Sequence, residues 1–148
     1  MSVLIDQEMA DSGAIDPEDL KDLAQEILHH CGHGESELSI LLVEDPRMRE
    51  LNNQYRQKDK TTNVLSFPMQ DGPEIPTGSM LGDVVISLDT AAREAEEKQV
   101  SLQQRTVRLL VHGVVHLLGF DHERSEIEAT QMLTEEERIM GLITARIY

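Results

Sequence analysis

The sequence predicts an α/β fold: a single domain over residues 1–148, in which a mixed sheet of about four strands is covered by helices. Short apolar runs of strand length occur at 3–5, 38–43, 63–68 and 82–87. Between these runs, and throughout the last third of the chain, apolar residues recur at helical spacing. A chain of 148 residues can bury one core, and with only 3% aromatic residues that core must be aliphatic.

The elements of the first half follow from caps and apolar spacing. Residues 3–5 are expected to form an edge strand. The Asp-Pro pairs at 16–17 and 45–46 each predict a helix start, with aspartate as N-cap and proline at the first helical position. The second of these helices is expected to turn Met48, Leu51 and Tyr55 inward.

The second half begins with a strand ended by a proline and then a loop. Residues 70–80 hold two prolines and two glycines, which predicts a mobile loop. A helix is expected over 88–99, with Ala91, Ala92 and Ala95 forming a face that packs closely.

Two capping boxes mark the last two helices. Ser101 and Gln104 begin a helix that is apolar nearly all round in its second half, so it should run through the core. Ser125 and Glu128 begin the final helix. Its inward residues are expected to be Ala129, Met132, Leu133 and Ile139.

Three histidines stand at the end of the predicted buried helix. His112 and His116 are four residues apart and therefore share one helix face. Gly119 can end the helix in a left-handed conformation, so that the chain turns back and presents His122 to the same point. Three imidazoles converging in this way predict an open site for one divalent metal ion, such as zinc, nickel, copper or iron.

This HxxxHxxGxxH spacing is that of the metzincin metalloproteases, with one departure. Their catalytic glutamate follows the first histidine, and Gly113 occupies that position here. The metal ligands are therefore present while the protease base is missing. A second group of histidines at 29, 30 and 33 is interpreted as a solvated helix end rather than as a second metal site.

Arg56, Lys58 and Lys60 form the one dense basic cluster in the sequence, in a segment expected to follow a helix. An arginine near a metal can bind a phosphate with two hydrogen bonds, but a solvated loop arginine explains the same pattern equally well. Asp121 is either a support for a ligand or a turn residue.

Composition limits the possible partners and location. The net charge of −15 argues against broad binding to nucleic acid, so no DNA partner is expected. The lone cysteine, Cys31, fits a reducing compartment, and neither a signal peptide nor a membrane-spanning run is evident. A cytoplasmic protein without a membrane partner is the resulting prediction.

Three stretches resemble the YbeY family of bacterial endoribonucleases. Residues 112–122 are similar to the family's HGxxHLxGxDH, 51–68 to its LNxxYRxKDxxTxVLSFP, and 81–87 to its LGDIxIS. Thr61 stands where proline is common and Phe120 where tyrosine is common, and neither is a proposed ligand.

The resemblance implies a zinc-type metal on His112, His116 and His122 and a mixed four-stranded sheet; nickel is the alternative that three imidazole ligands also allow. It also implies action on RNA, with Arg56 important for cleavage. Members of the family are implicated in maturing the 3′ end of small-subunit ribosomal RNA and in ribosome quality control, so the ribosome and its small-subunit assembly proteins are the implied partners.

The hypothesis that follows is a metal-dependent, single-strand-specific endoribonuclease. Two alternatives stay open from the sequence. One is a metalloprotease, suggested by the ligand spacing and opposed by Gly113. The other is a non-catalytic ribosome-assembly factor with a structural metal, whose acidic surface would suit basic ribosomal proteins.

Overall fold

Strands and helices alternate in the first part of the chain, and the last part is helical. The computed structural model describes residues 2–8, 15–69, 78–120 and 125–147, and it gives side chains for these except at 2 and 144–147. The elements, in chain order, are β1 (Ser2–Glu8), α1 (Pro17–His30), β2 (Glu37–Val43), α2 (Asp45–Arg56), β3 (Val64–Pro68), β4 (Met80–Ser87), α3 (Leu88–Lys98), α4 (Leu102–Leu117) and α5 (Glu126–Ile147).

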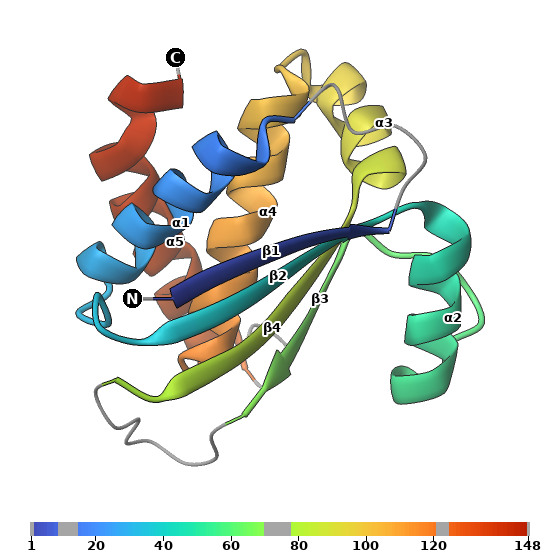
Figure 1. Cartoon of the computed structure of the whole chain (residues 1–148), viewed down its shortest axis with the longest axis horizontal. Helices are drawn as coiled ribbons and strands as arrows, with labels where there is room; N and C mark the ends of the chain where they lie inside the picture. Colours follow the sequence, from blue (N-terminus) through green and yellow to red (C-terminus); the bar gives the residue numbers. More distant parts are fainter. Residues whose placement is uncertain (1, 9–14, 70–77, 121–124, 148) are drawn as a thin grey trace.

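The four strands form one mixed sheet in the order β1-β2-β4-β3 (Figure 1). β2 runs parallel to both β1 and β4, whereas β3 is antiparallel to β4 and lies at the edge. The predicted α/β fold with a mixed four-stranded sheet is therefore confirmed, as is the edge strand at the N-terminus.

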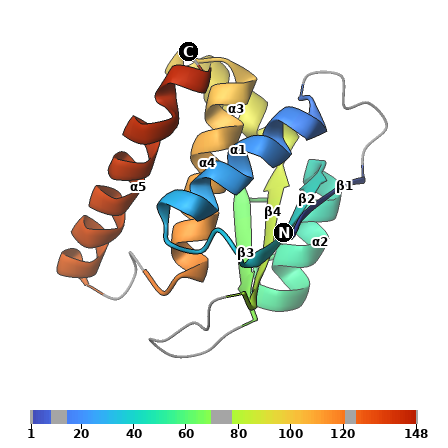
Figure 2. The same ribbon diagram turned by 60° about the vertical axis from the view of Figure 1, so that its left-hand side comes forward.

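Helices cover the two faces of the sheet unequally. α1 and α4 pack on one face, with α5 outside them, and α2 lies on the opposite side (Figure 2). The larger apolar cluster fills the space between the sheet and α1, α4 and α5. A smaller one lies toward α2 and consists of Val43, Met48, Leu51, Leu65 and Val85. The sheet is thus buried thoroughly only on the α4 side.

α4 is the buried central helix that the sequence predicts. The Ser101–Gln104 capping box is present in both directions, and nine residues of the helix are buried. It contacts β3 and β4 as well as α3 and α5, so it is held from several sides. Gly119 follows with φ +104°, a conformation that suits glycine and turns the chain away from the helix.

Some predicted orientations are wrong. Tyr55 is 55% exposed and rests edge-to-face on Phe67, because α2 covers only part of its sheet face. Leu133 is 53% exposed, since α5 is the outermost helix and buries a single stripe. Ala92 is exposed, while Ala91 and Ala95 are buried.

Two further expectations concern the loop and membranes. Most of the predicted loop at 70–80 lies outside the described residues, and its last residue, Met80, begins β4. Within the described ranges, no helix combines the length and apolar character needed to cross a membrane.

Candidate active site

A cavity of about 360 Å³ lies where the end of α2, the edge strand β3 and α4 meet. Its walls come from segments far apart in the sequence. The lining residues are Asn52, Arg56, Lys58, Lys60, Thr62, Asn63, Val64, Leu65, Ser66, His112 and His116. The cavity therefore brings together two of the three predicted metal ligands and the predicted phosphate-binding arginine. His122 and Asp121 lie outside the described residues.

The histidine pair is placed by a very close approach of α4 to the sheet. A Cβ on Gly113 would lie 2.7 Å from Val84 Cγ1 and 3.2 Å from Ser66 Oγ. The Ser66 hydroxyl donates a hydrogen bond to the Gly113 carbonyl (3.1 Å). Position 113 thus faces the sheet, while His112 and His116 line the cavity beside it.

Behind His112 lies a carboxylate that the sequence analysis did not single out. Glu136 on α5 is 6% exposed, and its Oε2 lies 3.0 Å from Nδ1 of His112. A metal-binding histidine is usually supported at its other ring nitrogen by such a carboxylate, so the donor set fits a metal. The signal was present in the sequence, since 136 falls on the buried stripe of Met132, Ile139 and Ile143.

Glu136 and the histidine pair do not form a complete metal site by themselves. Among the residues that the structure describes, no three His, Cys, Asp or Glu side chains are grouped to hold an ion. The histidines near the end of α1 make local contacts instead, with His33 Nδ1 3.3 Å from Ser36 Oγ.

Arg56 is the last residue of α2 rather than part of the following loop. Gln57 then adopts a left-handed conformation, with φ 57°, and turns the chain away from the helix axis. The Arg56 side chain is exposed, and no carboxylate within the described ranges pairs with it. The other arginines whose side chains are described each pair with an acid: Arg47, Arg49, Arg93, Arg105, Arg108 and Arg138.

Hydrogen bonds from α2 hold the segment after Arg56 in place, and its lysines line the cavity. Asp59, which stands between Lys58 and Lys60, is bound by the Arg49 guanidinium at 2.7 and 3.1 Å. The buried Asn52 donates from its amide to the Lys60 carbonyl at 2.8 Å. The one acid in this basic segment is therefore neutralised outside the cavity.

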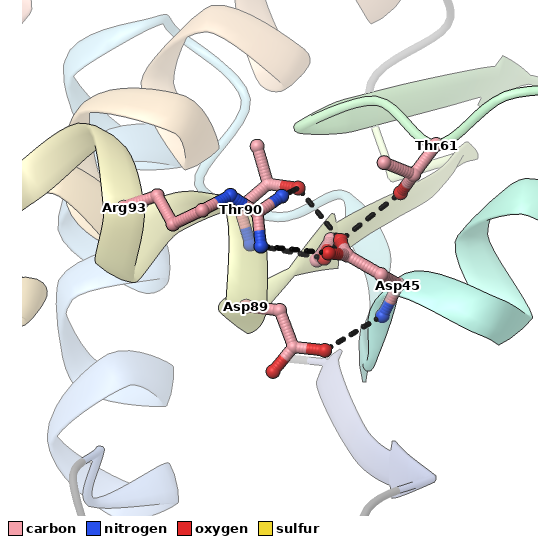
Figure 3. Close-up of polar contacts among 6 residues, drawn as sticks. Asp45, Thr61, Asp89, Thr90 and Arg93 are labelled. Carbon is pink, nitrogen blue, oxygen red and sulfur yellow. Dashed lines mark hydrogen bonds and ion pairs between the residues drawn. The ribbon is translucent and has the colours of Figure 1, made fainter.

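The carboxylate of Asp45 also binds the segment before β3, as part of a larger network of hydrogen bonds (Figure 3). Its Oδ1 accepts hydrogen bonds from three hydroxyls, and its Oδ2 lies 2.8 Å from Arg93. The three donors are Thr61 at 3.0 Å, Ser87 at 2.6 Å and Thr90 at 2.7 Å. These bonds join the start of α2 to the segment before β3, the end of β4 and the first turn of α3.

Asp45 therefore differs from the N-cap that the sequence predicts. Glu44 occupies the cap position without a side-chain bond, and Asp45 is the first residue of the helix. Burial alone would raise the pKa of Asp45, but the hydrogen bonds from Ser87, Thr90, Arg93 and Thr61 outweigh it and lower the pKa to about 2.

The cavity walls carry positive and neutral groups. Three cations line it, and none of the lining residues in the described part of the chain is a carboxylate. In a protein with a net charge of −15, these three cations give the described lining of the cavity a local positive charge.

Comparisons with known proteins agree with these motifs. A family model described as Endoribonuclease YbeY matches residues 5–144. The endoribonuclease YbeY of Persephonella marina is 43% identical over 137 residues, which cover 93% of this chain and 89% of that protein. The endoribonuclease YbeY of Geobacter metallireducens is 46% identical over 126 residues, 84% of each chain. The solution structure of TM1509 from Thermotoga maritima shares the fold, with a TM-score of 0.62 and 24% identity over 97% of this chain and 93% of that one.

Proposed function

We propose that this chain, which belongs to the YbeY family of endoribonucleases, cleaves RNA in the cavity between α2, β3 and α4. One observation carries the proposal. An arginine unpaired by any described carboxylate and two lysines share a cavity with a helical histidine pair, in an otherwise strongly acidic protein. A phosphodiester is the substrate group that such a combination of cations and imidazoles suits.

In this proposal His112, His116 and His122 hold one divalent metal ion, most favourably Zn²⁺, with Ni²⁺ as the alternative. The contact between Glu136 and Nδ1 of His112 supports it, since metal-binding histidines are usually held by a carboxylate at one ring nitrogen. When bound, the ion would supply Lewis acidity toward a phosphate oxygen.

Arg56 binds the scissile phosphate through its planar guanidinium and offsets the charge that builds on it during cleavage. Lys58 and Lys60 bind neighbouring phosphates of the same strand. The fastenings of their segment to Arg49 and Asn52 support this role, because they keep the cations in place before the substrate arrives.

The biological substrate in this proposal is the 3′ end of small-subunit ribosomal RNA, in maturation and in quality control of ribosomes. Ribosomal and small-subunit assembly proteins are then the partners, and the acidic surface suits basic ribosomal proteins. The cytoplasmic location belongs to the same proposal.

The test is a cleavage assay on matched substrates. Protein purified without a histidine tag is given one sequence as single-stranded RNA, as duplex RNA and as single-stranded DNA, with casein as a protein substrate. We expect cleavage of single-stranded RNA only, its loss with a chelator, and its return when Zn²⁺ is added back. Cleavage of casein would favour the protease alternative, and metal binding without any cleavage would favour a non-catalytic assembly factor.

A further inference from the structure

A buried carboxylate lies directly behind the proposed metal site. Glu136 is 6% exposed and belongs to α5, whereas its two partners, His112 and Arg108, lie one turn apart on α4. Its Oε2 is 3.0 Å from His112 Nδ1, and its Oε1 is 3.5 Å from Arg108 Nε. The carboxylate is thus held between an imidazole and a guanidinium.

Beside an ionised carboxylate, a neutral His112 can make this contact in only one of its two tautomers. An ionised carboxylate only accepts hydrogen bonds, so Nδ1 of a neutral His112 must be the donor. Nε2, on the opposite side of the ring, then holds the lone pair. Because His112 lines the cavity and Glu136 does not, the carboxylate acts on the cavity through the ring.

From this geometry we infer that Glu136 is a positioning residue of the active site. It sets the tautomer and the ring orientation of His112, so that Nε2 carries the lone pair that a divalent cation would require of this histidine. The inference deepens the proposed function and rests on it for the identity of the ligand, but the tautomer is a property of the metal-free protein.

A merely structural role explains the position poorly. The neighbours of Glu136 on the buried stripe of α5 are Met132, Ile139 and Ile143, which pack against the core. Burying a carboxylate among such residues costs stability unless the charge is paired, and an apolar side chain would avoid that cost. Arg108 pairs with one oxygen of Glu136 and offsets part of this cost, while the other oxygen contacts the His112 imidazole, which an apolar residue could not orient.

The next residue offers a matched control. Glu137 also pairs with Arg108, at 3.0 Å, but its side chain is 62% exposed. The structure gives it no contact with His112 among the described residues. Glu137→Gln therefore removes the same charge from the same helix and disturbs the same arginine, while it leaves the imidazole untouched.

The first measurement is the tautomer of His112 in metal-free protein, read from long-range ¹⁵N–¹H NMR correlations at alkaline pH. The parent and Glu137→Gln should both carry the proton on Nδ1. Glu136→Leu should lose that preference, and Glu136→Gln should keep part of it, because an amide oxygen also accepts. A parent protein with the His112 proton on Nε2 would overturn the inference.

The second measurement is the affinity for Zn²⁺, by competition with a chromophoric chelator. Losing a partner of this kind typically weakens metal binding by about 10–100-fold, which we expect for Glu136→Leu, with a smaller loss for Glu136→Gln and none for Glu137→Gln. Unchanged affinity in both Glu136 variants would refute the inference even if the parent binds Zn²⁺ tightly.

With both measurements, failure of the inference about Glu136 can be told apart from failure of the proposed metal site. Failure of the parent to bind Zn²⁺ would defeat the metal site, yet the tautomer would still decide the role of Glu136. If Glu136→Leu does not fold, the parent tautomer and the Glu136→Gln variant carry the test.

Discussion

Val84 on β4 and Gly113 on α4 approach each other so closely that a Cβ on Gly113 would lie 2.7 Å from Val84 Cγ1. Val84 is fully buried, so its side chain has no room to withdraw. Position 113 is where a metzincin carries its catalytic glutamate. The packing that brings α4 against the sheet therefore leaves no room for a glutamate side chain at position 113.

Gly113→Glu is accordingly expected to destabilise the protein without creating a protease. Overpacking of a core typically costs about 1–3 kcal/mol, and a charged side chain adds to this. Thermal melts and casein hydrolysis measure the two effects. Gly113→Ala is the milder comparison, because it adds only the clashing carbon. A Gly113→Ala melting temperature equal to the parent's would show that the close contact is unimportant.

The Asp45 network predicts a specific loss of stability in acid. Because the pKa of Asp45 is about 2 in the folded protein and 3.8 ordinarily, its contribution is fully present above the higher value. It is lost as the pH falls through the folded value, since the unfolded chain binds the proton more readily. The shift from 3.8 to about 2 corresponds to an upper limit of roughly 2–3 kcal/mol, before allowance for the exposure of Arg93.

Asp45→Asn should therefore lower the free energy of unfolding at neutral pH and flatten its dependence between about pH 4 and 2. Urea unfolding at a series of pH values measures both changes. Asp22→Asn, at an exposed position of α1, serves as the control and should leave the profile unchanged. A parent-like profile in Asp45→Asn would show that the hydrogen bonds in Figure 3 do not stabilise the ionised form.

His116→Ala is expected to abolish stoichiometric metal binding. A metal that binds only the folded state raises its stability, so the variant should also lose the rise in melting temperature on adding Zn²⁺. Elemental analysis and thermal melts provide the readouts. His29→Ala, at the exposed end of α1, is the matched control and should bind metal normally. Equal metal content in His116→Ala and the parent would count against the site.

The sequence predicts the local features of this fold well, because they depend on neighbouring residues. The Asp16 cap, the Ser101–Gln104 capping box and the burial of α4 are each set within a few positions of the chain. The histidine pair is equally local, since helical spacing alone puts His112 and His116 on one face.

Long-range partners could not be predicted in the same way. The carboxylate that supports His112 comes from a residue 24 positions later, on a helix whose rotation the apolar pattern defines only roughly. In the sequence Asp45 resembles an N-cap residue. In the structure its carboxylate instead accepts hydrogen bonds from three hydroxyls of separate segments. Tyr55 has an apolar ring at helical spacing, and only the three-dimensional arrangement reveals that α2 leaves it exposed.

The central claim is that Arg56 binds the phosphate that is cleaved, and its substitution tests this most directly. Arg56→Lys should recover only part of the activity of the parent, because an ammonium group cannot form the planar two-bond contact. Arg47→Gln is the control: it removes a half-buried arginine from the same helix, outside the cavity, and should cleave RNA normally.

The decisive measurement is the rate at which Arg56→Glu cleaves single-stranded RNA, taken together with its metal content and melting temperature. Loss of a group that stabilises transition-state charge typically costs about 10²–10³ in rate, so we expect a fall of that order with metal and fold unchanged. Cleavage at the parent's rate, with the metal in place, would contradict the account.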